Sequence, residues 1–167
     1  MIGPMKRLLI IWHSRTGAAR AMAEAAARGG AAEPGTTVRL VPAEAATADD
    51  LLAADGYLFA GPENLAALSG EMKAFLDRTY YDALERLNGR PYAHMIAAGS
   101  DGTGAARQLA RIALGWRLKP VAEPLIVVTH AQTPEAIHTS KILTEADLAR
   151  CRELGAAMAA GMAMGVF

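Results

Sequence analysis

Two hydroxyl side chains, Ser14 and Thr16, stand in a short polar segment, HSRTG at residues 13–17, directly after the apolar run at residues 8–12. An alanine-rich segment with helical spacing follows. A buried strand, a tight loop and a helix N-terminus in this order bring backbone N–H groups and the positive end of the helix dipole to one point, which suits a phosphate. The hydroxyl groups can add hydrogen bonds, and Gly17 lets the backbone approach closely or adopt a positive φ. The segment predicts a phosphate-binding loop, although the hydroxyls could instead only cap the helix and the arginine between them could face solvent.

Two further loops contain glycine and polar residues directly after apolar runs. The first, at residues 61–69, follows the run YLFA at 57–60, and the second, GSDGTG at 99–104, follows the run at 92–98. The carboxyl ends of parallel strands share one edge of a sheet, and ligands of open α/β folds bind there. We therefore expect both loops to meet the phosphate-binding loop in space.

The apolar runs and the segments between them predict an α/β fold. Strands are expected at residues 8–12, 37–41, 57–60, 92–98 and 125–129. They alternate with about five helices, the last two at 105–114 and 144–162, and a helix is also expected at 69–87, whereas residues 131–141 lack a clear period and predict a loop. Such alternation gives a parallel sheet covered on both faces, and right-handed crossovers favour the strand order 2-1-3-4-5. Residues 1–167 contain no repeat or linker, so a single domain is expected.

Charge balance and cysteine content narrow the function classes. The chain has 17 Lys and Arg against 17 Asp and Glu, so electrostatics give no reason to expect nucleic acid or an anionic membrane as a partner. Cys151 is the single cysteine, which excludes an intrachain disulfide and favours a reducing, cytoplasmic location. Zinc-ligand spacing, a Ser-His-Asp grouping and the P-loop pattern are absent, which argues against a metal site and against hydrolases. The apolar tail at 155–167 is shorter than the roughly 20 residues that span a bilayer.

Three segments together resemble one family. HSRTGAA, from residue 13, is similar to the phosphate loop of flavodoxins and flavodoxin-like reductases. AADGYLFAGPENLAALSGEMKAFLDRTYY, from residue 53, resembles the third strand, the ring-side loop and the next helix of flavodoxin-like NAD(P)H-dependent flavin and quinone reductases. AAGSDGTGAARQLARIALGWRLKP, from residue 97, resembles their fourth strand, second flavin loop and helix. The resemblance implies a flavodoxin-like three-layer α/β/α sandwich with a five-stranded parallel sheet that binds flavin mononucleotide (FMN).

The resemblance also implies which residues contact FMN. The phosphate would be surrounded by Ser14, Arg15, Thr16, Gly17 and Ala18, one side of the isoalloxazine ring by Pro62, Glu63, Asn64 and Leu65, and its other edge by Gly99, Ser100, Asp101 and Gly102. Three of the polar residues in these loops leave alternatives open. Glu63 could contact the ring or stay peripheral, Asp101 could form a turn instead of binding a ligand, and His13 could reach the flavin or remain a partly buried loop residue.

The sequence departs from the family pattern at two places. Ala19 stands where related phosphate loops carry Thr or Asn, and residues 64–68 contain no aromatic side chain to stack on the ring. Aliphatic packing could replace the aromatic, or it could come from Trp12, from the pair Tyr80-Tyr81 or from a neighbouring subunit.

The implied function is an NAD(P)H-dependent FMN oxidoreductase that reduces a quinone, a free flavin or another small acceptor, with NADH or NADPH as electron donor. The redox chemistry then belongs to the flavin, so no side chain needs to act as acid or base and the catalytic residues stay unassigned. One alternative is a flavodoxin-type electron carrier, which the neutral charge disfavours because such carriers tend to be acidic. Another is a protein that keeps the fold and binds flavin weakly. Related reductases are often dimers, so a homodimer is possible, with Tyr80 and Tyr81 in the interface.

Overall fold

The apolar runs of the sequence lie side by side in one sheet. The structure is a computed structural model that describes residues 3–167. Its strands are β1 (Lys6–Trp12), β2 (Thr36–Pro42), β3 (Gly56–Asn64), β4 (Ala67–Leu68), β5 (Pro91–Ala98), β6 (Lys119–Pro120) and β7 (Leu125–Val128). Its helices are α1 (Ala18–Ala31), α2 (Ala48–Ala53), α3 (Gly70–Ala83), α4 (Thr103–Gly115), α5 (Pro134–His138) and α6 (Glu145–Met164).

The sheet has the strand order β2-β1-β3-β5, and β7 pairs with β5 on its outer side. All pairs among these five strands are parallel. The order 2-1-3-4-5 predicted for the five expected strands is therefore confirmed. Two strands were not expected: β4 pairs antiparallel with the end of β3, and β6 pairs with the start of β5.

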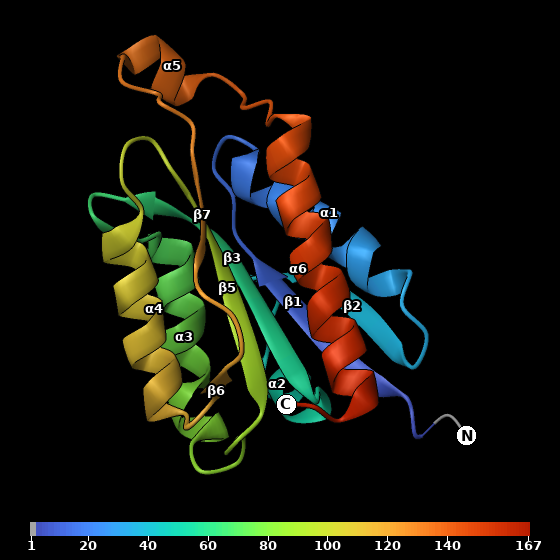
Figure 1. Ribbon diagram of the computed structural model, residues 1–167. Helices are drawn as coiled ribbons and strands as arrows, with labels where there is room; N and C mark the ends of the chain where they lie inside the picture. Colours follow the sequence, from blue (N-terminus) through green and yellow to red (C-terminus); the bar gives the residue numbers. More distant parts are fainter. Residues whose placement is uncertain (1–2) are drawn as a thin grey trace.

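Helices cover both faces of the sheet, which gives three layers (Figure 1). Helices α1 and α6 pack on one face, and α2, α3 and α4 pack on the other. The middle strands form the centre of the core, since all of β5 and residues 8–11 of β1 are buried. This rigid frame fixes the carboxyl ends of β1, β3 and β5, from which the three expected loops start.

One helix is shorter than expected, and one helix was not expected. The helix expected at 69–87 ends earlier, at Ala83, and Glu85 then adopts a φ of 64° that no α-helix contains. The segment 131–141, expected to be a loop, contains α5. Thr133 caps this helix by accepting a hydrogen bond from the Ala136 N–H, and Pro134 occupies the first turn. A threonine cap followed by proline is a helix-start signal that hydrophobic periodicity does not detect.

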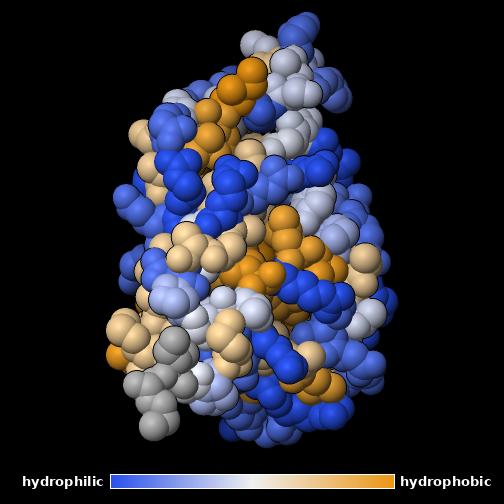
Figure 2. Space-filling model, turned by 90° about the vertical axis from the view of Figure 1, so that its right-hand side faces the viewer, coloured by the Kyte–Doolittle hydropathy of each residue, from blue (hydrophilic) through white to orange (hydrophobic). Residues whose placement is uncertain are grey.

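Strand β2 forms one edge of the sheet, and that side of the molecule is hydrophilic over most of its surface, with smaller apolar areas between (Figure 2). Thr37 and Arg39 of β2 are exposed there. Polar and charged side chains on an edge strand discourage pairing with the sheet of another molecule. Within residues 3–167, no helix is long and apolar enough to cross a membrane.

Candidate functional site

The carboxyl ends of β1, β3 and β5 open onto a cavity at the end of the sheet where α5 lies (Figure 1). Its volume is about 560 Å³, within the range of roughly 300–1,000 Å³ that is common for small-molecule sites. Residues of three loops and of a fourth segment line it: Ser14, Arg15, Thr16, Ala18, Ala19, Pro62, Glu63, Asn64, Leu65, Ala97, Ala98, Gly99, Thr129, Ala131, Ile137 and Lys141. Nine of the thirteen positions assigned to FMN are in this group, and Gly17, Ser100, Asp101 and Gly102 are not.

The loop after β1 leaves the start of α1 without a side-chain cap. Gly17 is the N-cap residue with a φ of 99°, and its side chain can accept nothing. Ser14 Oγ accepts a hydrogen bond from the Gly17 N–H at 3.1 Å, so this hydroxyl shapes the turn. The first turn of α1 contains no acidic residue. The N–H groups of this turn and the positive end of the helix dipole therefore face the cavity without a protein anion.

The fourth segment of the cavity wall comes from residues 129–141, which the sequence did not assign to the site. The Lys141 N–H donates to the Thr16 carbonyl oxygen at 2.8 Å. The Lys141 ammonium donates to Thr16 Oγ1 at 3.3 Å and to the Ile137 carbonyl oxygen at 3.0 Å. Hydrophobic periodicity gives no signal for this contact, because it joins residues that are 125 positions apart.

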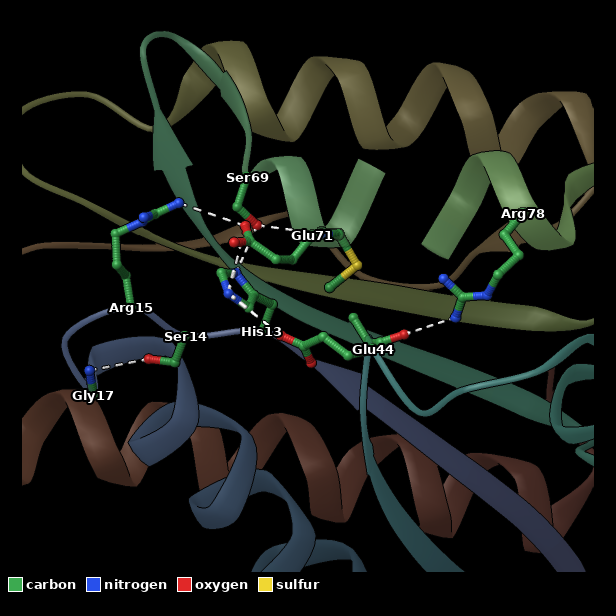
Figure 3. Close-up of polar contacts among 10 residues, drawn as sticks. His13, Ser14, Arg15, Gly17, Glu44, Ser69, Glu71 and Arg78 are labelled. Atoms are coloured by element: carbon green, nitrogen blue, oxygen red, sulfur yellow. Dashed lines mark hydrogen bonds and ion pairs between the residues drawn. The ribbon is translucent and has the colours of Figure 1, made fainter. Parts of the chain in front are cut away.

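Arg15 lines the cavity, but its guanidinium group is directed toward α3. Its Nη2 lies 3.5 Å from Glu71 Oε2, and Figure 3 shows the side chain extended toward that carboxylate. More than half of the Arg15 side chain is exposed. Arg15 therefore neutralises Glu71 in this structure, and an ion pair with a phosphate remains a prediction.

His13 is buried behind the loop and does not line the cavity. Its Nδ1 lies 2.8 Å from Ser69 Oγ, and its Nε2 lies 3.6 Å from a carboxylate oxygen of both Glu44 and Glu71 (Figure 3). Ser69 Oγ also accepts from the Met72 N–H as the cap of α3, so this hydroxyl joins His13 to the first turn of that helix. A hydrogen bond to its own backbone N–H, helped by nearby His13 and Arg15, lowers the pKa of Glu71. His13 thus ties the phosphate loop to α3, the structural alternative of the two considered.

The loop after β3 is a tight hairpin rather than an irregular loop. Leu65 and Ala66 have φ angles of 52° and 64° and connect β3 to β4. Positive φ at both turn residues is typical of a type I′ hairpin, which usually contains Asn-Gly. Leu65 is fully exposed at the tip, and Asn64 Nδ2 is buried without a hydrogen-bond partner. The hairpin thus presents an apolar side chain and an unused amide donor at the cavity wall.

Glu63 has a role that neither sequence alternative included. Its two carboxylate oxygens accept from the Gly102 N–H at 2.9 Å and the Ala105 N–H at 3.0 Å. The side chain therefore caps α4 and holds the third loop against the β3 hairpin, and its contact with the ring stays a prediction. Asp101 accepts from the Thr103 N–H and hydroxyl, which is the turn role that was considered for it.

The aromatic side chains that could have covered the ring lie elsewhere. Tyr80 stacks on Trp116 with 5.5 Å between ring centroids, Tyr81 meets the edge of Tyr80, and Trp12 packs under Arg20. All the residues that line the cavity are non-aromatic, and its exposed apolar walls include Leu65 and Ile137. Within one chain the structure supports the aliphatic alternative, and an aromatic side chain from a neighbouring subunit stays a prediction.

Two ionisable side chains away from the cavity, Cys151 and His94, are buried in the core. Burial raises the pKa of Cys151 to about 11, which keeps this thiol protonated and unreactive near neutral pH. Burial lowers the pKa of His94 to about 4. Across residues 3–167, no group of three His, Cys, Asp or Glu side chains is arranged to hold a metal ion.

The cavity fits FMN on the chemistry of its lining. At one end the uncapped start of α1, the Ser14 and Thr16 hydroxyls and the Lys141 ammonium offer donors and positive charge for a phosphate. At the other end the unused Asn64 amide can donate to a ring carbonyl, and aliphatic side chains can cover a flat apolar ring.

Two named proteins are similar to this chain over part of its length. The chain is 35% identical over 100 residues to a flavodoxin of Aquifex aeolicus, which is 60% of this chain and 54% of that protein. It is 34% identical over 95 residues to an NAD(P)H dehydrogenase (quinone) of Acidithiobacillus ferrooxidans, which is 45% of this chain and 48% of that protein. The chain thus spans about half the length of the curated relatives it matches.

A solved flavodoxin from the domain Archaea has the same fold, with a TM-score of 0.74 at 19% identity over 92% of this chain and 96% of that one. The predicted flavodoxin-like class is therefore confirmed. A family described as NADPH-dependent FMN reductase matches residues 32–133, which include β3, the hairpin and the third loop. From this match, the chain belongs to the NADPH-dependent FMN reductase family.

Proposed function

We propose that this protein binds FMN in the cavity and transfers electrons from NADH or NADPH to a quinone, a free flavin or another small acceptor. The observation that carries the proposal is the cavity itself, with donors and positive charge at the start of α1 and aliphatic walls at the β3 hairpin. Membership of the family supports FMN as the cofactor. The similarity to a quinone-reducing dehydrogenase supports a small-molecule acceptor.

The proposed FMN contacts follow the three loops. The phosphate would lie at Ser14, Arg15, Thr16, Gly17 and Ala18, and the ring would lie between Pro62, Glu63, Asn64 and Leu65 on one side and Gly99, Ser100, Asp101 and Gly102 on the other. Positions that do not line the cavity would act through the backbone or through the shape of their loops. Gly102, for example, has a φ of 94° and donates its N–H to Glu63, which keeps the third loop in place.

The chemistry divides between the cofactor and the chain. FMN, when bound, supplies the redox chemistry. The chain orients the ring through Asn64 and excludes water with the aliphatic walls at Leu65 and Ile137. The ionisable side chains that line the cavity are Arg15, Glu63 and Lys141, and each already has a partner in the chain. We therefore propose that no side chain of the cavity acts as acid or base.

Titration of the purified apoprotein with FMN tests the cofactor, with the quenching of flavin fluorescence as the signal. Saturable binding is expected, and its absence would contradict the proposal. Oxidation of NADH and of NADPH is then followed at the nicotinamide absorbance with and without a soluble quinone. Acceptor-dependent turnover is the expected result. FMN binding without turnover with either nicotinamide would support the electron-carrier alternative instead.

Assembly and location are part of the same proposal. We propose a homodimer of single-domain, cytoplasmic subunits that needs neither nucleic acid nor a membrane as a partner. Tyr81 supports an interface on α3, because this large side chain is 81% exposed beside the packed Tyr80 and Trp116 rings. Sedimentation velocity of wild-type protein and of Tyr81→Glu tests the interface, and an unchanged monomer in both would contradict it.

A further inference from the structure

Lys141 places a positive charge on the phosphate loop from the far end of the chain. Its backbone N–H is bonded to the Thr16 carbonyl oxygen at 2.8 Å, which fixes the residue against the loop independently of its side chain. The ammonium group then lies on Thr16 Oγ1 at 3.3 Å. The residue is partly buried and lines the cavity together with Thr16.

The Lys141 ammonium has hydrogen-bond partners in the protein, but none of them carries a negative charge. Its acceptors are Thr16 Oγ1 and the carbonyl oxygens of Ile137 and Thr139, all of which are uncharged. The ion pairs found within residues 3–167 do not include Lys141. A phosphate oxygen could replace the longest of these contacts, because hydrogen bonds between opposite charges are stronger than those to neutral oxygens.

Arg15, the cation that the sequence assigned to the phosphate, is used differently. Its guanidinium group pairs with Glu71, on the α3 side of the loop (Figure 3). Glu71 lies 3.6 Å from His13 Nε2 as well, so this carboxylate is part of a contact network that is separate from Lys141. Of the two cations that line the cavity, Lys141 is thus the one whose charge is not balanced by a carboxylate.

We propose that Lys141 is the counter-charge of the flavin phosphate and that it makes the site select a phosphorylated flavin over riboflavin. This inference rests on the proposed FMN site and adds a residue and a ligand preference to it. The uncapped N–H groups of α1 would bond the phosphate oxygens from one side, and the ammonium would balance the phosphate charge from the other. Riboflavin has the same ring without the phosphate, so it would gain nothing from Lys141.

The test compares the dissociation constants of FMN and riboflavin for wild-type protein, Lys141→Met, Lys141→Arg and Lys119→Met, measured by quenching of flavin fluorescence. Lys119 is an exposed lysine of β6 at the amino end of β5, away from the cavity, and serves as the matched control. Lys141→Met should weaken FMN binding by about tenfold or more, with riboflavin binding changed by less than about twofold. Lys141→Arg should keep most of the FMN affinity, and Lys119→Met should keep all of it.

The salt dependence of flavin binding can be measured on wild-type protein alone, so it does not depend on whether a variant folds. FMN binding to wild-type protein should weaken as ionic strength rises, and riboflavin binding should not. If Lys141→Met leaves the dissociation constant of FMN unchanged, or weakens the binding of FMN and riboflavin equally, the inference is overturned while the proposed function stays intact. If wild-type protein does not bind FMN at all, the proposed function fails and this inference fails with it.

Discussion

Thr16 is the residue at which the phosphate loop meets the segment that carries Lys141. Its carbonyl oxygen accepts from the Lys141 N–H, and its hydroxyl oxygen accepts from the Lys141 ammonium. The hydroxyl hydrogen remains free, because a hydroxyl can accept and donate at the same time. Thr16 can therefore donate to a phosphate oxygen while its carbonyl oxygen keeps the backbone of Lys141 in place.

We expect Thr16→Val to weaken FMN binding by about 1–3 kcal/mol, because a charged phosphate oxygen loses a donor. Valine has a shape close to that of threonine, and the backbone bond to Lys141 is kept. The measurement is an FMN titration by fluorescence quenching, with Thr37→Val on the exposed β2 edge as the control. An FMN constant equal to that of wild-type protein would remove Thr16 from the proposed phosphate contacts.

At the scale of elements, α1 and α6 are in backbone contact along the face of the sheet. A Cβ atom on Gly155 of α6 would lie 1.9 Å from the Ala26 carbonyl oxygen of α1, and a Cβ on Gly29 of α1 would lie 2.0 Å from the Arg152 carbonyl oxygen of α6. Glycines on both helices thus allow the close approach. The same packing sets the position of α1, whose first turn faces the cavity.

Gly155→Ala is expected to lower the free energy of unfolding by about 1–3 kcal/mol, because the added methyl group forces the two helices apart. The matched variant is Gly70→Ala at the start of α3, where an added Cβ has no neighbour within 4 Å. That change should be neutral or slightly stabilising, since alanine has the higher helix propensity. Urea unfolding of both variants measures the difference. Equal midpoints for the two would show that the crossing of α1 and α6 adapts without cost.

At the scale of the whole molecule, local features were predictable from the sequence and distant contacts were not. The strand at 8–12, its polar loop and its helix are adjacent in the chain, so apolar runs and glycine positions were sufficient to place them. Lys141 reaches Thr16 only through the complete fold, with 125 positions between them. The β3 hairpin was missed for another reason, because Leu65 and Ala66 adopt the positive φ angles that Asn and Gly normally signal. Glu63 as a cap of α4 likewise depends on two segments that only the sheet brings together.

His94 couples the stability of the whole molecule to pH. The side chain is 3% exposed, stacks on Tyr92 and has no hydrogen-bond partner at either ring nitrogen. Burial lowers the pKa of His94 to about 4 in the folded protein, whereas a histidine in the unfolded chain has a pKa near 6.5. Above that value both states are neutral and the stability is complete. As the pH falls from 6.5 toward 4 the unfolded state takes up the proton first, so the free energy of unfolding should fall, by about 2 kcal/mol between pH 7 and 5.

Urea unfolding at several pH values measures how the free energy of unfolding depends on pH. His94→Phe should flatten this dependence, and His138→Gln, a control at an exposed site, should keep it. A slope that is the same in His94→Phe as in wild-type protein would assign the acid sensitivity to other groups.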